Sequence, residues 1–104
     1  MSRLLHNGAP PEGADVTASG VLLLPRQEGR KYVAIVNTSN NVPIYLALND
    51  SPDGTTNQAE VGKGIYISPD GGSYEITEDN LYKGEIWAIH GGPGTVPVTI
   101  QRGS

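Results

Sequence analysis

Turn-forming residues cut this chain into many short apolar runs. It contains 14 glycines and 8 prolines among 104 residues. The runs are rich in Val, Ile and Tyr, and clusters of Gly, Pro, Asn, Asp or Ser bound each of them. This pattern is typical of consecutive β-strands joined by turns. A helical bundle would need longer stretches of helical apolar periodicity, so the sequence predicts an all-β fold.

Length and charge narrow the class of protein further. A chain of 104 residues has the usual size of a single domain with one hydrophobic core. Seven Lys and Arg against eleven Asp and Glu give a formal net charge of −4, and the cations are scattered. Because this charge repels phosphate backbones, we expect no nucleic-acid partner. The absence of cysteine excludes disulfides and thiolate chemistry within the chain.

Residues 1–20 differ from the remainder because they contain Gly and Pro without apolar periodicity. We therefore expect a flexible N-terminal arm over residues 1–20 and a β-sandwich domain over residues 21–104. The first ten residues lack the apolar stretch of a secretory signal peptide, and no segment approaches the roughly 20 apolar residues that span a bilayer. We expect a protein made in a cytoplasm, without a membrane partner.

The spacing of the apolar runs predicts seven or eight short strands. Runs 32–36 and 44–48 flank a cluster of turn-forming residues and predict a first hairpin. Runs 65–67 and 73–77 flank a Pro-Asp-Gly turn and predict a second hairpin.

Two further segments are predicted to be edge strands. Residues 58–61 form a short run beside a long polar loop, and residues 95–101 alternate cleanly but include Pro97, which lacks a backbone N–H. Short strands without a convincing helix indicate a single-domain antiparallel β-sandwich or jelly roll, or a small barrel. The sequence leaves the strand order open.

Patterns of catalytic or metal-binding residues are lacking. The two histidines, His6 and His90, are far apart, and neither belongs to an HxH or HExxH motif. We interpret His90 as a strand-end residue bonded to a loop carbonyl group. Residues 50–54 resemble the start of a calcium loop but lack its glutamate at position twelve, and residues 62–64 lack the phosphate-binding motif. We expect no enzymatic activity, cofactor or metal.

Several apolar residues are candidates for an interaction surface. Tyr45, Tyr66 and Trp87 each lie opposite an aliphatic face of their own strand, so they would cover the outside of a sheet. Such aromatic residues serve either as a contact with a neighbouring subunit, which we favour, or as a stacking platform for a sugar or base. With the apolar residues of the arm and the first run, the candidate interface comprises Leu4, Leu5, Val21, Leu22, Leu23, Leu24, Tyr45, Tyr66 and Trp87.

Three segments carry a resemblance to known proteins. They are RKYVAIVNTSNNVPIYLALN (30–49), GKGIYISPDGGSYEIT (62–77) and LYKGEIWAIHGG (81–92). Together they resemble a group of small structural proteins of tailed bacteriophages. The shared residues belong to strands and turns, so no active site is implied. The resemblance implies a virion component, either a capsid decoration (cement) protein with a jelly-roll or β-sandwich fold or a small tail or adaptor part.

This resemblance leads to an expected function. A cement protein fastens neighbouring capsid subunits through many copies, each of which makes modest contacts. We expect a non-enzymatic protein on the capsid surface that bridges subunits of the phage major capsid protein and associates with itself as a homotrimer. The alternatives are a tail or head-tail connector component and, from a different class, a carbohydrate-binding module or cupin-like enzyme.

Overall fold

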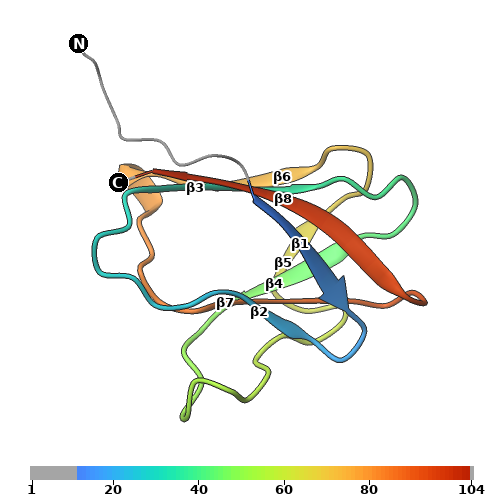
Figure 1. Ribbon diagram of the computed structural model, residues 1–104, viewed down its shortest axis with the longest axis horizontal. Coiled ribbons are helices and arrows are strands. Elements are labelled where there is room, and N and C mark those ends of the chain that lie inside the picture. The colour runs from blue at the N-terminus through green and yellow to red at the C-terminus, as the bar shows by residue number, and fades with distance from the viewer. Residues whose placement is uncertain (1–11, 104) are drawn as a thin grey trace.

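A computed structural model describes residues 12–103, which form two β-sheets packed face to face (Figure 1). The expected all-β fold is confirmed. Over these residues the elements are eight strands and one short 3-10 helix: β1 (Glu12–Thr17), β2 (Val21–Leu24), β3 (Tyr32–Asn37), β4 (Ile44–Leu48), β5 (Ile65–Ile67), β6 (Ser73–Ile76), η1 (Glu78–Asn80), β7 (Ile86–His90) and β8 (Thr95–Gly103).

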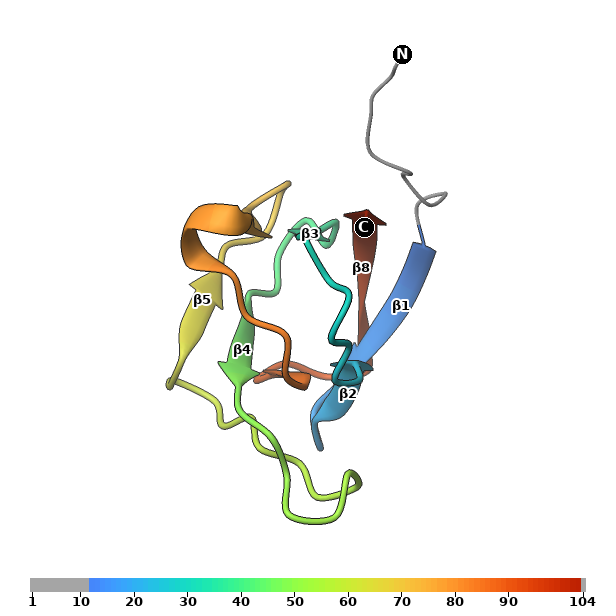
Figure 2. The same ribbon diagram turned by 90° about the vertical axis from the view of Figure 1, so that its left-hand side faces the viewer.

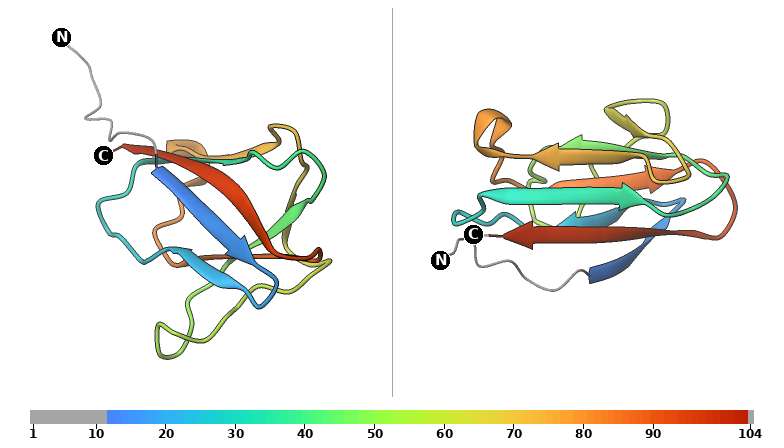
Figure 3. Two further views of the ribbon diagram at one scale, coloured as in Figure 1. Left: turned by 45° about the vertical axis from the view of Figure 1, so that its right-hand side comes forward. Right: turned by 90° about the horizontal axis from the view of Figure 1, so that it is seen from above.

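The strand order is that of a jelly roll. One sheet has the order β1-β8-β3-β6 and the other β2-β7-β4-β5, and all neighbours are antiparallel. The chain therefore pairs like one long folded hairpin, β1 with β8, β2 with β7, β3 with β6 and β4 with β5. These pairs alternate between the two sheets, as in eight-stranded jelly rolls. Figure 3 shows the strands of the first sheet side by side.

The two predicted hairpins are wrong, because their strands lie in different sheets. β3 pairs with β6 and β8, whereas β4 pairs with β5 and β7. β5 and β6 are likewise in opposite sheets. Alternating apolar residues do not distinguish a hairpin from a crossing between sheets, because both sheets bury one face in the same core.

The buried side chain of Asn37 lies where both crossings meet. Its Nδ2 donates hydrogen bonds to the carbonyl oxygens of Val42, at 2.9 Å, and Ile67, at 3.2 Å. Its Oδ1 accepts a hydrogen bond from the Ser39 N–H at 3.0 Å. Asn37 is fully buried, so these bonds satisfy the polar groups of its side chain, which water does not reach. This side chain therefore links the β3–β4 and β5–β6 crossings.

The predicted boundary of the arm at residue 20 is wrong. β1 pairs with β8 from Glu12↔Ile100 to Thr17↔Thr95, and Val16 is fully buried in the core. The sequence concealed this strand because Gly13 and Asp15 separate its few apolar side chains. The remainder of the predicted arm, with Leu4 and Leu5, lies outside the described residues.

Neither predicted edge strand is confirmed. β8 lies between β1 and β3, and Pro97 is tolerated because it falls beyond the last β3–β8 pair, Asn37↔Val98. Residues 58–61 form no strand. The side chain of Asn57 instead bonds both the N–H and the carbonyl oxygen of Ala59, each at 2.9 Å, which removes these groups from strand pairing.

The core lies between the two sheets and is almost entirely aliphatic. Alternate residues of each strand point inward, and burial of each aliphatic side chain contributes about 1.5–3 kcal/mol. Its buried members are Val16, Leu24, Val33, Ile35, Ile44, Leu46, Ile67, Ile76, Ile86, Ala88, Val96, Val98 and Ile100.

Candidate interaction surface

The β2-β7-β4-β5 sheet carries a second apolar cluster on its outer face. Trp87 and Ile89 of β7 are buried there, although their side chains point away from the core between the sheets. Leu22 from β2 and Tyr45 from β4 pack against them, as does Ala47. Side chains alternate along a strand, so this cluster is formed by the residues opposite the core positions.

The loop of residues 49–64 covers part of this outer face. It connects β4 to β5 and passes on the side of the sheet away from the core (Figures 1 and 2). Its Ala59 packs against the outer cluster and leaves Trp87 only 4% exposed. At Gly20, before β2, a Cβ atom would lie 2.3 Å from the side chain of Asn57, so the loop reaches that edge of the sheet.

The part of the outer face over β4 and β5 remains open to solvent. Tyr66 is 58% exposed and Val61 is 47% exposed. The rings of Tyr45 and Tyr66 meet edge to face, with centroids 5.6 Å apart and an interplanar angle of 61°. Such aromatic pairs contribute about 0.5–1.5 kcal/mol beyond their burial, which helps to fix the position of Tyr66.

A groove of about 280 Å³ lies beside this aromatic pair. Valine, proline and glycine form most of its wall, and Tyr45 contributes to both the pair and the groove. We call the aromatic pair and the groove together the outer patch, and its residues are Asn41, Val42, Pro43, Tyr45, Val61, Tyr66, Gly91 and Gly92.

No residue of the outer patch is charged. Along the sequence, Val61 is flanked by Glu60 and Lys63, which form an ion pair of 3.4 Å. Both side chains are well exposed, so the pair contributes little stability, but it cancels the local charge. The outer patch is therefore neutral in a chain of net charge −4.

A buried arginine links two connecting segments at one end of the sandwich. Arg30 is 3% exposed, and its guanidinium donates hydrogen bonds to the carbonyl oxygens of Pro25 and Gly84, both at 2.8 Å, and of Tyr82 at 3.0 Å. Burial lowers the pKa of Arg30 from its ordinary value, but arginine remains charged at neutral pH. The fork of donors thus fixes the segments before β3 and before β7.

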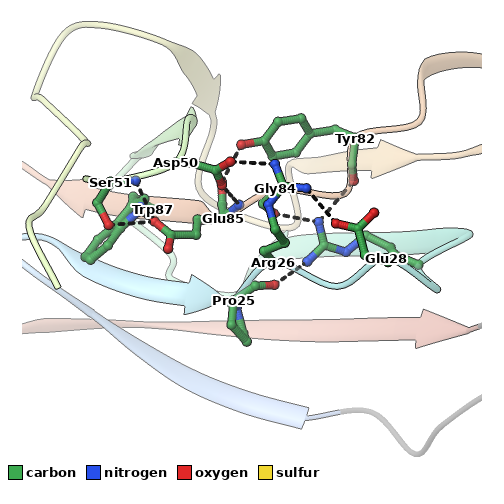
Figure 4. Close-up of polar contacts among 10 residues, drawn as sticks. Pro25, Arg26, Glu28, Asp50, Ser51, Tyr82, Gly84, Glu85 and Trp87 are labelled. Atoms are coloured by element: carbon green, nitrogen blue, oxygen red, sulfur yellow. Dashed lines mark hydrogen bonds and ion pairs between the residues drawn. The ribbon is translucent and has the colours of Figure 1, made fainter. Parts of the chain in front are cut away.

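A carboxylate network holds the start of the loop of residues 49–64, which we call the covering loop (Figure 4). Asp50 is in an ion pair with Arg26 and accepts a hydrogen bond from the Glu85 N–H at 2.8 Å. Glu85 Oε1 in turn accepts from the Ser51 N–H at 2.7 Å and from the Trp87 indole at 2.9 Å. The Arg26 guanidinium lowers the pKa of Asp50, and the Ser51 N–H lowers the pKa of Glu85. Both ionised carboxylates therefore stabilise the covering loop.

His90 has the structural role that the sequence indicated. It is fully buried, and its Nε2 lies 2.8 Å from the carbonyl oxygen of Gly94, while its Nδ1 accepts from the Gly92 N–H at 3.0 Å. These contacts assign the neutral tautomer with the proton on Nε2. Both ring nitrogens are occupied, so His90 shapes the β7–β8 turn. The other histidine, His6, lies outside the described residues.

The loop segment that resembles a calcium site is organised by its own residues. The Asp53 carboxylate accepts hydrogen bonds from the N–H groups of Thr55 and Thr56, both at 3.0 Å, which lower its pKa to about 2. Across residues 12–103, no three His, Asp or Glu side chains gather in a way that could hold a metal ion. The Asp53 carboxylate therefore serves to stabilise its own turn.

The structure brings together four of the predicted interface residues and separates the others. Leu22, Tyr45, Tyr66 and Trp87 belong to the outer face, although the loop covers Trp87. The remaining residues of β2 pack on the core, because a register shift between Leu22 and Leu24 interrupts the alternation. They are Val21, Leu23 and Leu24.

Sequence reasoning missed Val61 and the groove residues. Val61 lies next to Gly62 in a polar region, and only its exposure in the folded chain identifies it as part of a surface. Val42 and Pro43 follow a cluster of turn-forming residues, and the sequence assigns them to the connection of the predicted first hairpin. No local signal in the sequence indicated that these segments would meet.

Comparisons with known proteins give no relatives: no protein-family model, curated protein or solved structure matches this chain. Among the residues described, none lies in a helix long and apolar enough to cross a membrane.

Proposed function

We propose that this chain is a non-enzymatic phage structural protein that decorates and stabilises a capsid by bridging neighbouring major capsid subunits. The resemblance of residues 30–92 to small phage structural proteins supports this proposal. The jelly-roll order is compatible with it, since viral capsid domains share this architecture with lectins and cupins. Because a fold hosts many functions, the argument depends on the surface of the molecule.

The observation that carries the proposal is the open, neutral outer patch. Tyr66 and Val61 expose apolar surface that a small protein uses for association. Aromatic residues are enriched at the centres of interfaces, where they provide much of the binding energy. We propose that the protein acts on the capsid surface as a homotrimer, in many copies whose modest contacts reinforce one another.

The fixed positions of the patch residues support a role in fastening. The side chains of Asn37 and Ser39 form hydrogen bonds with the backbone of Val42. The ring of Tyr45 supports that of Tyr66. A preorganised surface loses less conformational entropy on binding than a mobile one. A rigid domain also transmits load between the subunits that it joins, as a cement protein must.

Binding to undecorated capsids tests this proposal. The full-length protein is mixed with shells of the major capsid protein encoded nearest its gene, and the bound fraction is measured by sedimentation. We expect saturable binding at a fixed ratio to capsid subunits, together with a higher melting temperature of the decorated shell. No binding at protein concentrations up to about 100 μM would contradict capsid decoration. Binding to purified tails instead would support the tail or connector alternative.

Glycan binding is a second candidate, because the exposed ring of Tyr66 lies beside a groove that includes the polar side chain of Asn41. Aromatic rings and amide groups are common in carbohydrate sites. NMR titration with a panel of soluble oligosaccharides tests this alternative. Saturable chemical-shift changes confined to the outer patch would support glycan binding, and unchanged spectra at 10 mM sugar would exclude it.

A further inference from the structure

The outer patch combines a projecting side chain with a groove on the same face. Tyr66 projects from β5 with 58% of its surface exposed. The groove of about 280 Å³ begins at Tyr45, whose ring touches that of Tyr66. A projecting aromatic side chain and an apolar groove of side-chain size are complementary in shape. Their proximity on one face allows one copy to supply the ring and another the groove.

Charge favours a second copy as the occupant of this groove. The patch is neutral, because Glu60 and Lys63 beside it are paired with each other. Two copies of a chain with net charge −4 repel one another overall, and a neutral face reduces this repulsion where they meet. Within the outer patch itself, no acidic side chain of one copy would face an acidic side chain of the other.

The limited area of the patch sets the strength of such a contact. A stable interface buries about 800 Å² on each partner. One exposed tyrosine, an exposed valine and a shallow groove provide on the order of a few hundred Å². The contact is therefore weak between free copies, with a dissociation constant of about 10 μM to 1 mM. Copies held close together on one surface have a raised effective concentration, which favours the contact.

We propose that the Tyr66 ring of one copy occupies the groove between Val42 and Val61 of a second copy. This contact identifies the surface through which the protein associates with itself. It rests on the proposed function only for the number of copies. A contact in which one copy supplies the tyrosine and the next supplies the groove closes into a ring of subunits when the rotation between neighbours permits closure.

Sedimentation velocity of the full-length protein between 10 μM and 1 mM tests the contact. We expect reversible association that Tyr66→Thr weakens at least about tenfold, because one central aromatic residue carries much of a small interface. Val61→Lys should have the same effect by placing a charge in the groove. Tyr32→Thr is the matched control, since Tyr32 belongs to the opposite sheet and its hydroxyl bonds Glu75. Circular dichroism melts establish that each variant is folded.

A mixture of the two weakened variants gives the sharpest test. The Tyr66→Thr variant keeps an intact groove and the Val61→Lys variant keeps its tyrosine, so one contact can form between them. We expect the mixture to form dimers at concentrations where each variant alone is monomeric.

Three results would overturn the proposed contact. They are a wild-type monomer up to 1 mM, association unaffected by Tyr66→Thr, and no complex in the mixture of variants. A wild-type dimer that depends on Tyr66 would support the contact while contradicting the trimer of the proposed function. Failure of capsid binding leaves this experiment unaffected.

Discussion

The side-chain amide of Asn37 donates a hydrogen bond to the carbonyl oxygen of Ile67 at 3.2 Å, which joins the end of β3 in one sheet to the end of β5 in the other. The bond is buried, and the same side chain bonds Val42 and Ser39. One residue therefore fixes both crossings between the sheets. These crossings place Val42, Pro43 and Tyr45 beside β5, so Asn37 also supports the groove of the outer patch.

Replacement of Asn37 should destabilise the whole domain. In Asn37→Ala, two carbonyl oxygens and one N–H lose their partners, so we expect a loss of about 2–4 kcal/mol in the free energy of unfolding. Urea titration followed by tryptophan fluorescence measures this loss. Asn49→Ala is a suitable control, because Asn49 bonds Gln58 on an exposed part of the loop and should change stability by less than about 0.5 kcal/mol. Equal losses in both variants would contradict the role of Asn37.

Arg30 should contribute to the stability of the fold through the geometry of its guanidinium as well as through its charge. Arg30→Lys retains the charge but offers a single ammonium group to three carbonyl oxygens, so we expect a loss of about 2–3 kcal/mol. The melting temperature should fall by roughly 10–20 °C. By contrast, Arg26→Lys should leave the melting temperature nearly unchanged, since its ion pairs are exposed. If the Arg30→Lys variant melts at the same temperature as the wild type, the charge of Arg30 alone is sufficient for its contribution to stability.

Acid should weaken the start of the covering loop. The folded protein holds the pKa values of Asp50 and Glu85 below their ordinary values, so both carboxylates bind protons more readily in the unfolded chain. Their stabilising effect is thus fully present above the unfolded pKa values near 4, and it is lost as the pH falls through the lower folded pKa values. Melting temperatures measured from pH 6 to pH 2 should fall most steeply below about pH 4.

The double variant Asp50→Asn/Glu85→Gln isolates the contribution of these carboxylates. It should be less stable than the wild type at pH 6 and should show a shallower decrease in melting temperature toward pH 2. Parallel curves for the two proteins would mean that other groups, such as Asp53 with its pKa of about 2, account for the acid sensitivity.

The sequence was sufficient to predict most of the strands but not their pairing. Most strands were recognisable because short Val- and Ile-rich runs end at turn residues, as at β3 and β7. β1 was missed because its inward positions alternate with Gly13 and Asp15. The sheet order depends on long-range contacts, such as that between Asn37 and Ile67, which leave no periodic signal along the chain.

The candidate surface was likewise predictable only in part. Tyr45 and Tyr66 could be assigned to the outside of a sheet because each lies opposite aliphatic neighbours in its strand. Trp87 satisfied the same rule, but a loop distant in sequence covers it. Position in a strand determines the face on which a side chain lies, whereas its exposure depends on what the remainder of the chain places above it.

Quantitative mass spectrometry of purified virions is the most direct test of capsid decoration. Virions from a phage that encodes this chain are purified, and its copy number is measured relative to the major capsid protein. We predict hundreds of copies in each particle, in a fixed ratio to capsid subunits, and the same ratio in tailless heads. Absence from the particle, or a handful of copies that disappear with the tail, would contradict the proposed function.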